Sequence, residues 1–194
     1  MLSFTLDTNC LVALEEQRDS APGIRALLSR HADGTAIVQI AATTAAENQV
    51  DGETLTDFAV FQNRLQLAGM GHLPILKPVL TWDFAYWDWG VWPDDSTDDE
   101  LRKIHEVLFP ALPYDFTPDA SMSAEGQAKA KRKWRNYRLD GLGLHTHIQA
   151  GGDVYVTSDR NFMKVTKKDP LAQLGAVIIL GPTEANAYAE RLDQ

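Results

Sequence analysis

The sequence contains a single cysteine, Cys10, among its 194 residues. One thiol cannot form an intramolecular disulfide, and a zinc site built from several cysteines is excluded as well. No apolar run approaches the roughly 20 residues that a membrane-spanning helix needs, and the opening MLSFTLDTN lacks the basic and apolar pattern of a signal peptide. We therefore expect a reducing, cytoplasmic setting and no membrane partner.

Basic residues are scarce in the first two thirds of the chain. Residues 1–128 hold 7 basic and 20 acidic side chains, whereas residues 129–194 hold 11 basic and 7 acidic ones, within a formal net charge of −9. The overall charge disfavours a nucleic-acid partner, because phosphates call for a basic surface. Six basic residues nevertheless gather in residues 129–138, directly before Asp140. They form either a solvated helix face or a surface for an RNA backbone, whose candidate contacts are Lys131, Arg132, Lys133, Arg135, Arg138 and, further along the chain, Arg160.

Short apolar segments rich in β-formers alternate with segments of helical periodicity. The pattern predicts strands over residues 2–6, 35–40, 152–157 and 176–180, and helices over 9–16, 20–33, 41–50, 54–69, 123–148 and 182–192. Strands that alternate with helices are typical of a mostly parallel sheet with helices on both faces. The fold class predicted is therefore a three-layer α/β/α domain that spans residues 1–194.

Residues 71–120 have a different character. They contain six of the nine prolines and four of the five tryptophans, Trp82, Trp87, Trp89 and Trp92. One helix interrupts the stretch, with Thr97 as its candidate cap and an acidic run over residues 94–100 as its first turn. We interpret the stretch as a mainly helical insertion. Its tryptophans either form a small core or stack on bases.

Four carboxylates occupy positions that suggest chemistry. Asp7 directly follows the first predicted strand, and Asp159 comes two residues after the third. Glu47 lies in the helix after the second strand, and Asp140 lies in the helical segment that leads into the third. Ligands of an open parallel sheet bind beyond the carboxyl ends of its strands. Acids that converge there repel each other unless a cation lies between them, and oxygen ligands select Mg²⁺ or Mn²⁺. Taken singly, Asp7 is as well explained as a helix N-cap and Glu47 as an exposed helix acid.

Four segments together resemble the PIN-domain family. FTLDTNCLVALEE is similar to its first motif, IVQIAATTAAENQV to its second, LDGLGLHTHIQAGGDVYVTSDRNF to the third and fourth, and AVIILGPTEANAYAERL to its last strand and helix. The resemblance covers residues 1–66 and 130–194. The spacing of Asp140 and Asp159 is its most specific part.

The resemblance implies a metal-dependent nuclease that hydrolyses RNA phosphodiesters. It assigns one or two Mg²⁺ or Mn²⁺ ions to the four acids, the turn after Asp7 to Thr8 and Asn9, and a supporting hydroxyl to Thr157, with Phe162 as a core anchor. Many members are toxins that pair with an antitoxin and dimerise. Asn161 stands where many members have a further acid, so we expect one firmly held ion.

Other interpretations compete with the nuclease. A catalytically weak module of the same fold would bind RNA or a protein partner, which Asn161 and the negative net charge favour. A phosphatase of the haloacid-dehalogenase type would need an acid or threonine where Asn9 stands. His145 and His147 are two residues apart on a predicted helix, so their side chains point to different sides and are not expected to share a metal.

Overall fold

A five-stranded sheet in which all strands are parallel forms the centre of the structure. The structure is a computed structural model that describes residues 1–43, 58–81 and 89–192. The strand order is β3-β2-β1-β4-β5. The strands are β1 (Ser3–Leu6), β2 (Ile37–Ala41), β3 (Ile75–Leu76), β4 (Val154–Val156) and β5 (Ile178–Leu180).

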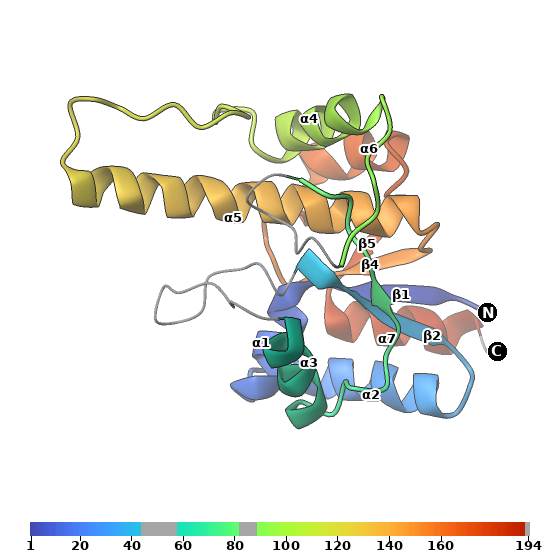
Figure 1. Ribbon diagram of the computed structural model, residues 1–194. Helices are drawn as coiled ribbons and strands as arrows, with labels where there is room; N and C mark the ends of the chain where they lie inside the picture. The colour runs from blue at the N-terminus through green and yellow to red at the C-terminus, as the bar shows by residue number, and fades with distance from the viewer. Residues whose placement is uncertain (44–57, 82–88, 193–194) are drawn as a thin grey trace.

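Helices cover both faces of the sheet, which confirms the predicted three-layer α/β/α class (Figure 1). One face carries α1 (Thr8–Glu15), α2 (Ala21–Ala32), α3 (Phe58–Leu67) and α7 (Pro182–Leu192). The other carries α4 (Thr97–Leu108), α5 (Ala124–Gln149) and α6 (Val165–Gln173). Within the described ranges, none of these helices is long and apolar enough to cross a membrane.

The central strand β1 is buried on both faces, as strands of covered parallel sheets are. Phe4 and Leu6 are fully buried in the core beneath α1, α2 and α7. Thr5 points to the opposite face, where its hydroxyl accepts a hydrogen bond from Gln39 Nε2 (3.1 Å) and lies 2.8 Å from His147 Nδ1. Burial lowers the pKa of His147 to about 4, so its ring is neutral at pH 7 and tolerated in this core.

Two elements were not predicted from the sequence, β3 and α6. β3 has two residues and lies between Pro74 and Pro78, so it is too short to show a strand pattern. It nonetheless pairs with β2 and forms the edge of the sheet. α6 contains an internal proline, Pro170, and only two of its residues are buried, which removes its helical periodicity.

The stretch interpreted as an insertion therefore contributes β3 to the sheet and α4 to its cover, where α4 packs against α5. The predicted helix over 41–50 falls mostly outside the described residues, as do Trp82 and Trp87.

The longest helix, α5, runs through Gly141 and Gly143, although glycine has a low helix propensity. Ser123 caps it by accepting a hydrogen bond from the Gly126 amide (3.2 Å). A Cβ on Gly143 would lie 3.2 Å from Thr43 Oγ1 and 3.3 Å from the Tyr155 hydroxyl, so the absence of a side chain lets α5 approach the sheet. The beginning of α5 projects beyond the sheet (Figure 1).

The two glycines of α5 make a matched pair for a stability test. A Cβ on Gly141 would meet only Ile104 Cγ2 at 3.7 Å, an ordinary contact. We expect Gly141→Ala to raise the free energy of unfolding by about 1 kcal/mol through helix propensity. Gly143→Ala should gain nothing or lose stability, because the buried Tyr155 cannot give way. Urea unfolding checks both variants, and an equal gain in the two would contradict this packing.

Candidate functional site

The strand order reverses between β1 and β4, which is where parallel sheets bind their ligands. At the carboxyl ends of these two strands a pocket of about 340 Å³ opens. It brings together three of the four predicted acids, Asp7, Asp140 and Asp159. The other lining residues are Thr8, Asn9, Arg18 and Ser158.

Asp7 caps α1 and also faces this pocket, so its two interpretations are compatible. Its Oδ1 accepts the Thr8 amide at 2.7 Å. Its Oδ2 accepts the Thr157 hydroxyl at 2.7 Å and Asn9 Nδ2 at 2.6 Å. Because a carboxylate accepts at about four lone-pair positions, donors on both of its oxygens fix the orientation of the group.

Thr157 connects the loop after β1 to the loop after β4. Besides donating to Asp7, its hydroxyl oxygen accepts Asn9 Nδ2 (2.8 Å) and the Asp159 amide (3.0 Å). Asn9 Oδ1 in turn accepts the Ser158 amide at 2.9 Å. The register that pairs Leu6 with Val156 produces this arrangement, because it sets Asp7 beside Thr157.

The surroundings of Asp7 disfavour the charged form of its carboxyl group. Burial raises the pKa of Asp7 above its ordinary value, and the charge of Asp159 acts in the same direction. The hydrogen bonds from Thr157 and Thr8 oppose this rise. A cation bound between Asp7 and Asp159 would relieve both unfavourable effects, since it would compensate the buried charge of Asp7 and offset the repulsion between the two carboxylates.

Asp140 comes to the pocket from α5, on a different element from the two strand-end acids. It is half-buried. Glu47, the fourth predicted ligand, lies outside the described residues. Within those residues, no three His, Cys, Asp or Glu side chains lie close enough together to hold a metal ion. The carboxylate oxygens that line the pocket are ligands that suit Mg²⁺ or Mn²⁺. The described acids alone do not form a closed ligand shell around such an ion.

Asn161 is turned away from the pocket. The backbone amide of Asn161 donates to Asp159 Oδ1 (2.7 Å), and this hydrogen bond shapes the turn after β4. Its side chain instead donates to the carbonyl of Leu108 at the end of α4 (2.9 Å) and accepts from Lys164 and Lys167. The described contacts give Asn161 a role in the turn, while Phe162 beside it is fully buried in the core under α4 and α6.

The predicted RNA contacts separate into two sets. Lys131, Arg132 and Lys133 are exposed on the projecting part of α5, and Arg160 is exposed next to Asp159. Arg138 packs its guanidinium 3.5 Å from the ring centroid of Tyr114 and donates to the Tyr114 carbonyl (3.0 Å). Arg135 is half-buried. Arg138 therefore contributes to the packing of α5 against the preceding segment.

Arg18 and Ser158 line the pocket but were not predicted. Arg18 reaches it because Gln17 adopts a positive φ of 53°, which ends α1 and turns the chain back. The Arg18 amide then bonds to the Ala13 carbonyl (2.9 Å), and its guanidinium pairs with Glu16 (2.6 Å). The local sequence offers no glycine or proline that would signal this turn.

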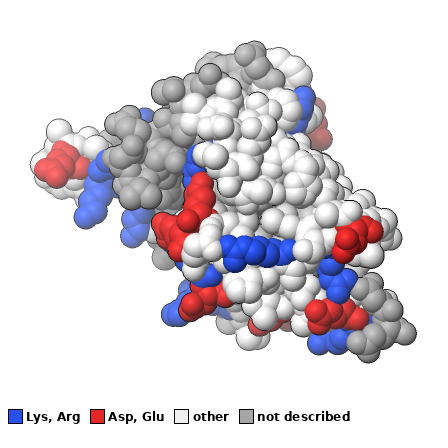
Figure 2. All heavy atoms as spheres, turned by 90° about the horizontal axis from the view of Figure 1, so that it is seen from below, with Lys and Arg blue, Asp and Glu red and all other residues white. Residues whose placement is uncertain are grey.

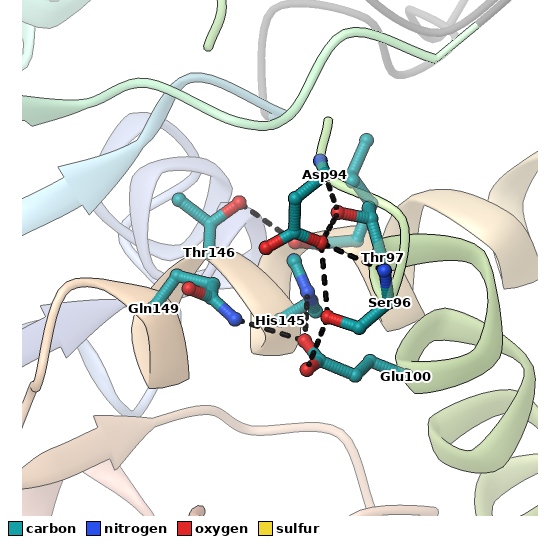
Figure 3. Close-up of polar contacts among 8 residues, drawn as sticks. Asp94, Ser96, Thr97, Glu100, His145, Thr146 and Gln149 are labelled. Atoms are coloured by element: carbon teal, nitrogen blue, oxygen red, sulfur yellow. Dashed lines mark hydrogen bonds and ion pairs between the residues drawn. The ribbon is translucent and has the colours of Figure 1, made fainter. Parts of the chain in front are cut away.

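His145 and the acidic run belong to a different network, between α4 and α5 (Figure 3). His145 Nε2 lies 3.0 Å from Glu100 Oε2, which also accepts Gln149 Nε2 (2.9 Å). Asp94 Oδ1 accepts the Ser96 amide (3.0 Å) and the Thr97 hydroxyl (2.9 Å), so the acidic run closes the start of α4. Thr97 is the first residue of α4, and the cap position is Ser96.

Comparisons with known proteins identify no relative: no family model, no curated protein and no solved structure matches the chain.

Thr157 offers a direct test of the network around Asp7. Thr157→Val keeps the shape of the side chain but removes one donor and one acceptor that serve Asp7, Asn9 and Asp159. We expect a loss of about 2–3 kcal/mol in the free energy of unfolding, because three polar partners lose a hydrogen bond. Thr157→Ser, which keeps the hydroxyl, should lose about 1 kcal/mol for its missing methyl group. Equal stability of the two variants in urea unfolding would contradict the role assigned to the hydroxyl.

Proposed function

We propose that the protein is a metal-dependent endoribonuclease in which Asp7 and Asp159 bind a single Mg²⁺ or Mn²⁺ ion that draws Asp140 into its ligand shell, with Glu47 as a further ligand. The observation that carries the proposal is the buried Asp7 carboxylate, which lines one pocket together with Asp140 and Asp159. An ion held by these residues would supply the Lewis acidity that the hydrolysis of a phosphodiester needs. The similarity of four segments to PIN domains supports the same chemistry.

The residues of the chain would prepare this reaction in separate ways. Thr157 and Asn9 fix the Asp7 carboxylate in the wall of the pocket. The backbone amide of Asn161 fixes the Asp159 carboxylate by a hydrogen bond. Arg18 lines the pocket as a cationic residue and would donate to a phosphate oxygen of the substrate.

A basic surface on α5 supports RNA as the substrate. Lys129, Lys133 and Asp140 follow the i, i+4, i+11 spacing, which places them on one face of the helix. The rise of a helix puts Lys129 about 16 Å from Asp140 along the axis, a length that several phosphates of a strand can span. In Figure 2, Lys and Arg side chains stand out from the projecting end of the molecule, where α5 begins. An RNA strand bound along this face of α5 would lead to the pocket.

A second candidate is a catalytically weak module that binds RNA or a protein partner through the same surfaces. It is favoured by the absence, among the described acids, of a group that could close around a metal ion. Asn161, which is neutral and engaged with α4 and α6, favours it too. An antitoxin partner, a role as the toxin of such a pair, and a homodimer are further proposals that depend on the family resemblance.

Cleavage of RNA by the purified full chain tests the proposed function. With a labelled single-stranded RNA and Mn²⁺ or Mg²⁺, we expect cleavage that EDTA abolishes and that Asp159→Asn reduces at least 100-fold, because the transition-state charge loses its metal. Asp153→Asn is the matched control, because Asp153 lies beyond the other end of β4 and bonds to Ser3.

The control should cleave at the wild-type rate. Activity that survives both EDTA and Asp159→Asn would refute the nuclease, and RNA binding without any cleavage would favour the weak module.

A further inference from the structure

Two lysines converge on one neutral oxygen beside the pocket. Lys167 donates from its ammonium to Asn161 Oδ1 and to the carbonyl of Leu108, and Lys164 Nζ lies 3.3 Å from the same Asn161 oxygen. Lys167 is only 8% exposed, whereas Lys164 is exposed to solvent. In the part of the chain that the structure describes, no carboxylate forms an ion pair with either lysine.

This arrangement is electrostatically unfavourable as it stands. Two ammonium groups share an amide oxygen that carries no formal charge, and a buried cation without a counter-ion is costly. Burial and the positive charge of Lys164 lower the pKa of Lys167, and the negative charge of Asp159 opposes this shift without forming an ion pair. An anion bound between the two ammonium groups would supply the missing compensation.

The start of α6 adds to the positive potential at this point. α6 begins at Val165 with Lys164 in the cap position, makes no side-chain cap hydrogen bond and has no acidic residue in its first turn. Helix N-termini carry a partial positive charge and usually attract acids. Here the first turn presents lysines, so both the helix and its side chains favour an anion.

The position of the pair relates it to the pocket. The side-chain oxygen of Asn161 accepts hydrogen bonds from both lysines. The backbone amide of Asn161 donates to Asp159 Oδ1 at 2.7 Å. Lys167 is near enough to Asp159 for the carboxylate to influence its proton affinity. The lysine pair therefore lies just beyond the acids, on the side of α6.

We propose that Lys164 and Lys167 form a phosphate-binding subsite next to Asp159, which takes the phosphodiester adjacent to the one that occupies the pocket. The identity of this ligand rests on the proposed nuclease function. The subsite itself is a site for a phosphate anion. Lys167 is its fixed cation, and the exposed Lys164 would contact the anion from the solvent side. The first backbone amides of α6 would be additional donors.

Binding of single-stranded RNA without catalysis tests the subsite. A fluorescein-labelled RNA of about ten nucleotides is titrated with the full chain in EDTA, and the anisotropy is followed at several salt concentrations. Each phosphate contact to a single strand contributes about 0.7 to the slope of log K against log salt. We expect Lys164→Gln to reduce the slope by about 0.7 and to weaken binding about fivefold at 0.1 M salt.

Further variants separate the subsite from a general charge effect. Lys164→Arg keeps the charge and should retain the wild-type slope. Arg191→Gln removes one charge from the end of α7, near the chain termini and away from the carboxyl ends of the strands (Figure 1), and should also retain it. Lys167→Gln should lower the slope as Lys164→Gln does, with circular dichroism as the check that it folds. If it does not fold, the comparison of Lys164→Gln with Arg191→Gln alone decides the test.

The outcomes are distinct. A slope for Lys164→Gln equal to that of Arg191→Gln would overturn the subsite, as would a wild-type chain that binds no RNA in EDTA. Reduced slopes together with absent cleavage in Mn²⁺ would support the subsite and refute the nuclease. Cleavage in Mn²⁺ together with unchanged slopes would support the nuclease and overturn the subsite.

Discussion

The structure at the candidate site depends on one buried carboxylate at the end of the central strand. Asp7 is almost fully shielded from water, yet donors from Thr8, Asn9 and Thr157 point at its oxygens. A carboxylate in such surroundings is costly unless hydrogen bonds or a cation compensate its charge. The two loops that form the pocket are arranged around this requirement, because the donors come from the segments after β1 and β4.

The same requirement links the fold to the proposed chemistry. Parallel pairing of β1 with β4 brings the strand-end acids to one edge of the sheet, and α5 adds Asp140 to the same pocket. Hydrogen bonds hold Asp7 and Asp159 in place, so these two carboxylates would need little reorganisation to bind a cation. Positive charge then lies at the borders of the pocket, on α5, on Arg18 and at the start of α6, where the anionic oxygens of a substrate would have to be held.

Much of the fold could be predicted from the sequence because its strands are short apolar runs between clear helices. Asp7 and Asp159 were placed correctly at strand ends, since the strands before them are buried and end close to these residues. β3 and α6 could not be predicted, because a two-residue strand has no period and α6 has few buried residues. Arg18 and the lysine pair depend on turns and tertiary contacts, which local sequence patterns do not encode. Glu47 stays a prediction, since it lies outside the described residues.

Titration of the full chain with Mn²⁺ in an isothermal calorimeter tests directly whether Asp7 and Asp159 bind a divalent ion. We expect one bound ion per chain at neutral pH, with binding lost in Asp7→Asn and in Asp159→Asn. Binding should be retained in Glu100→Gln, whose carboxylate lies in the separate network between α4 and α5. Circular dichroism must show the variants folded, because Asp7 also caps α1. An absence of Mn²⁺ binding to the folded wild-type chain, or equal binding to all four proteins, would contradict the claim.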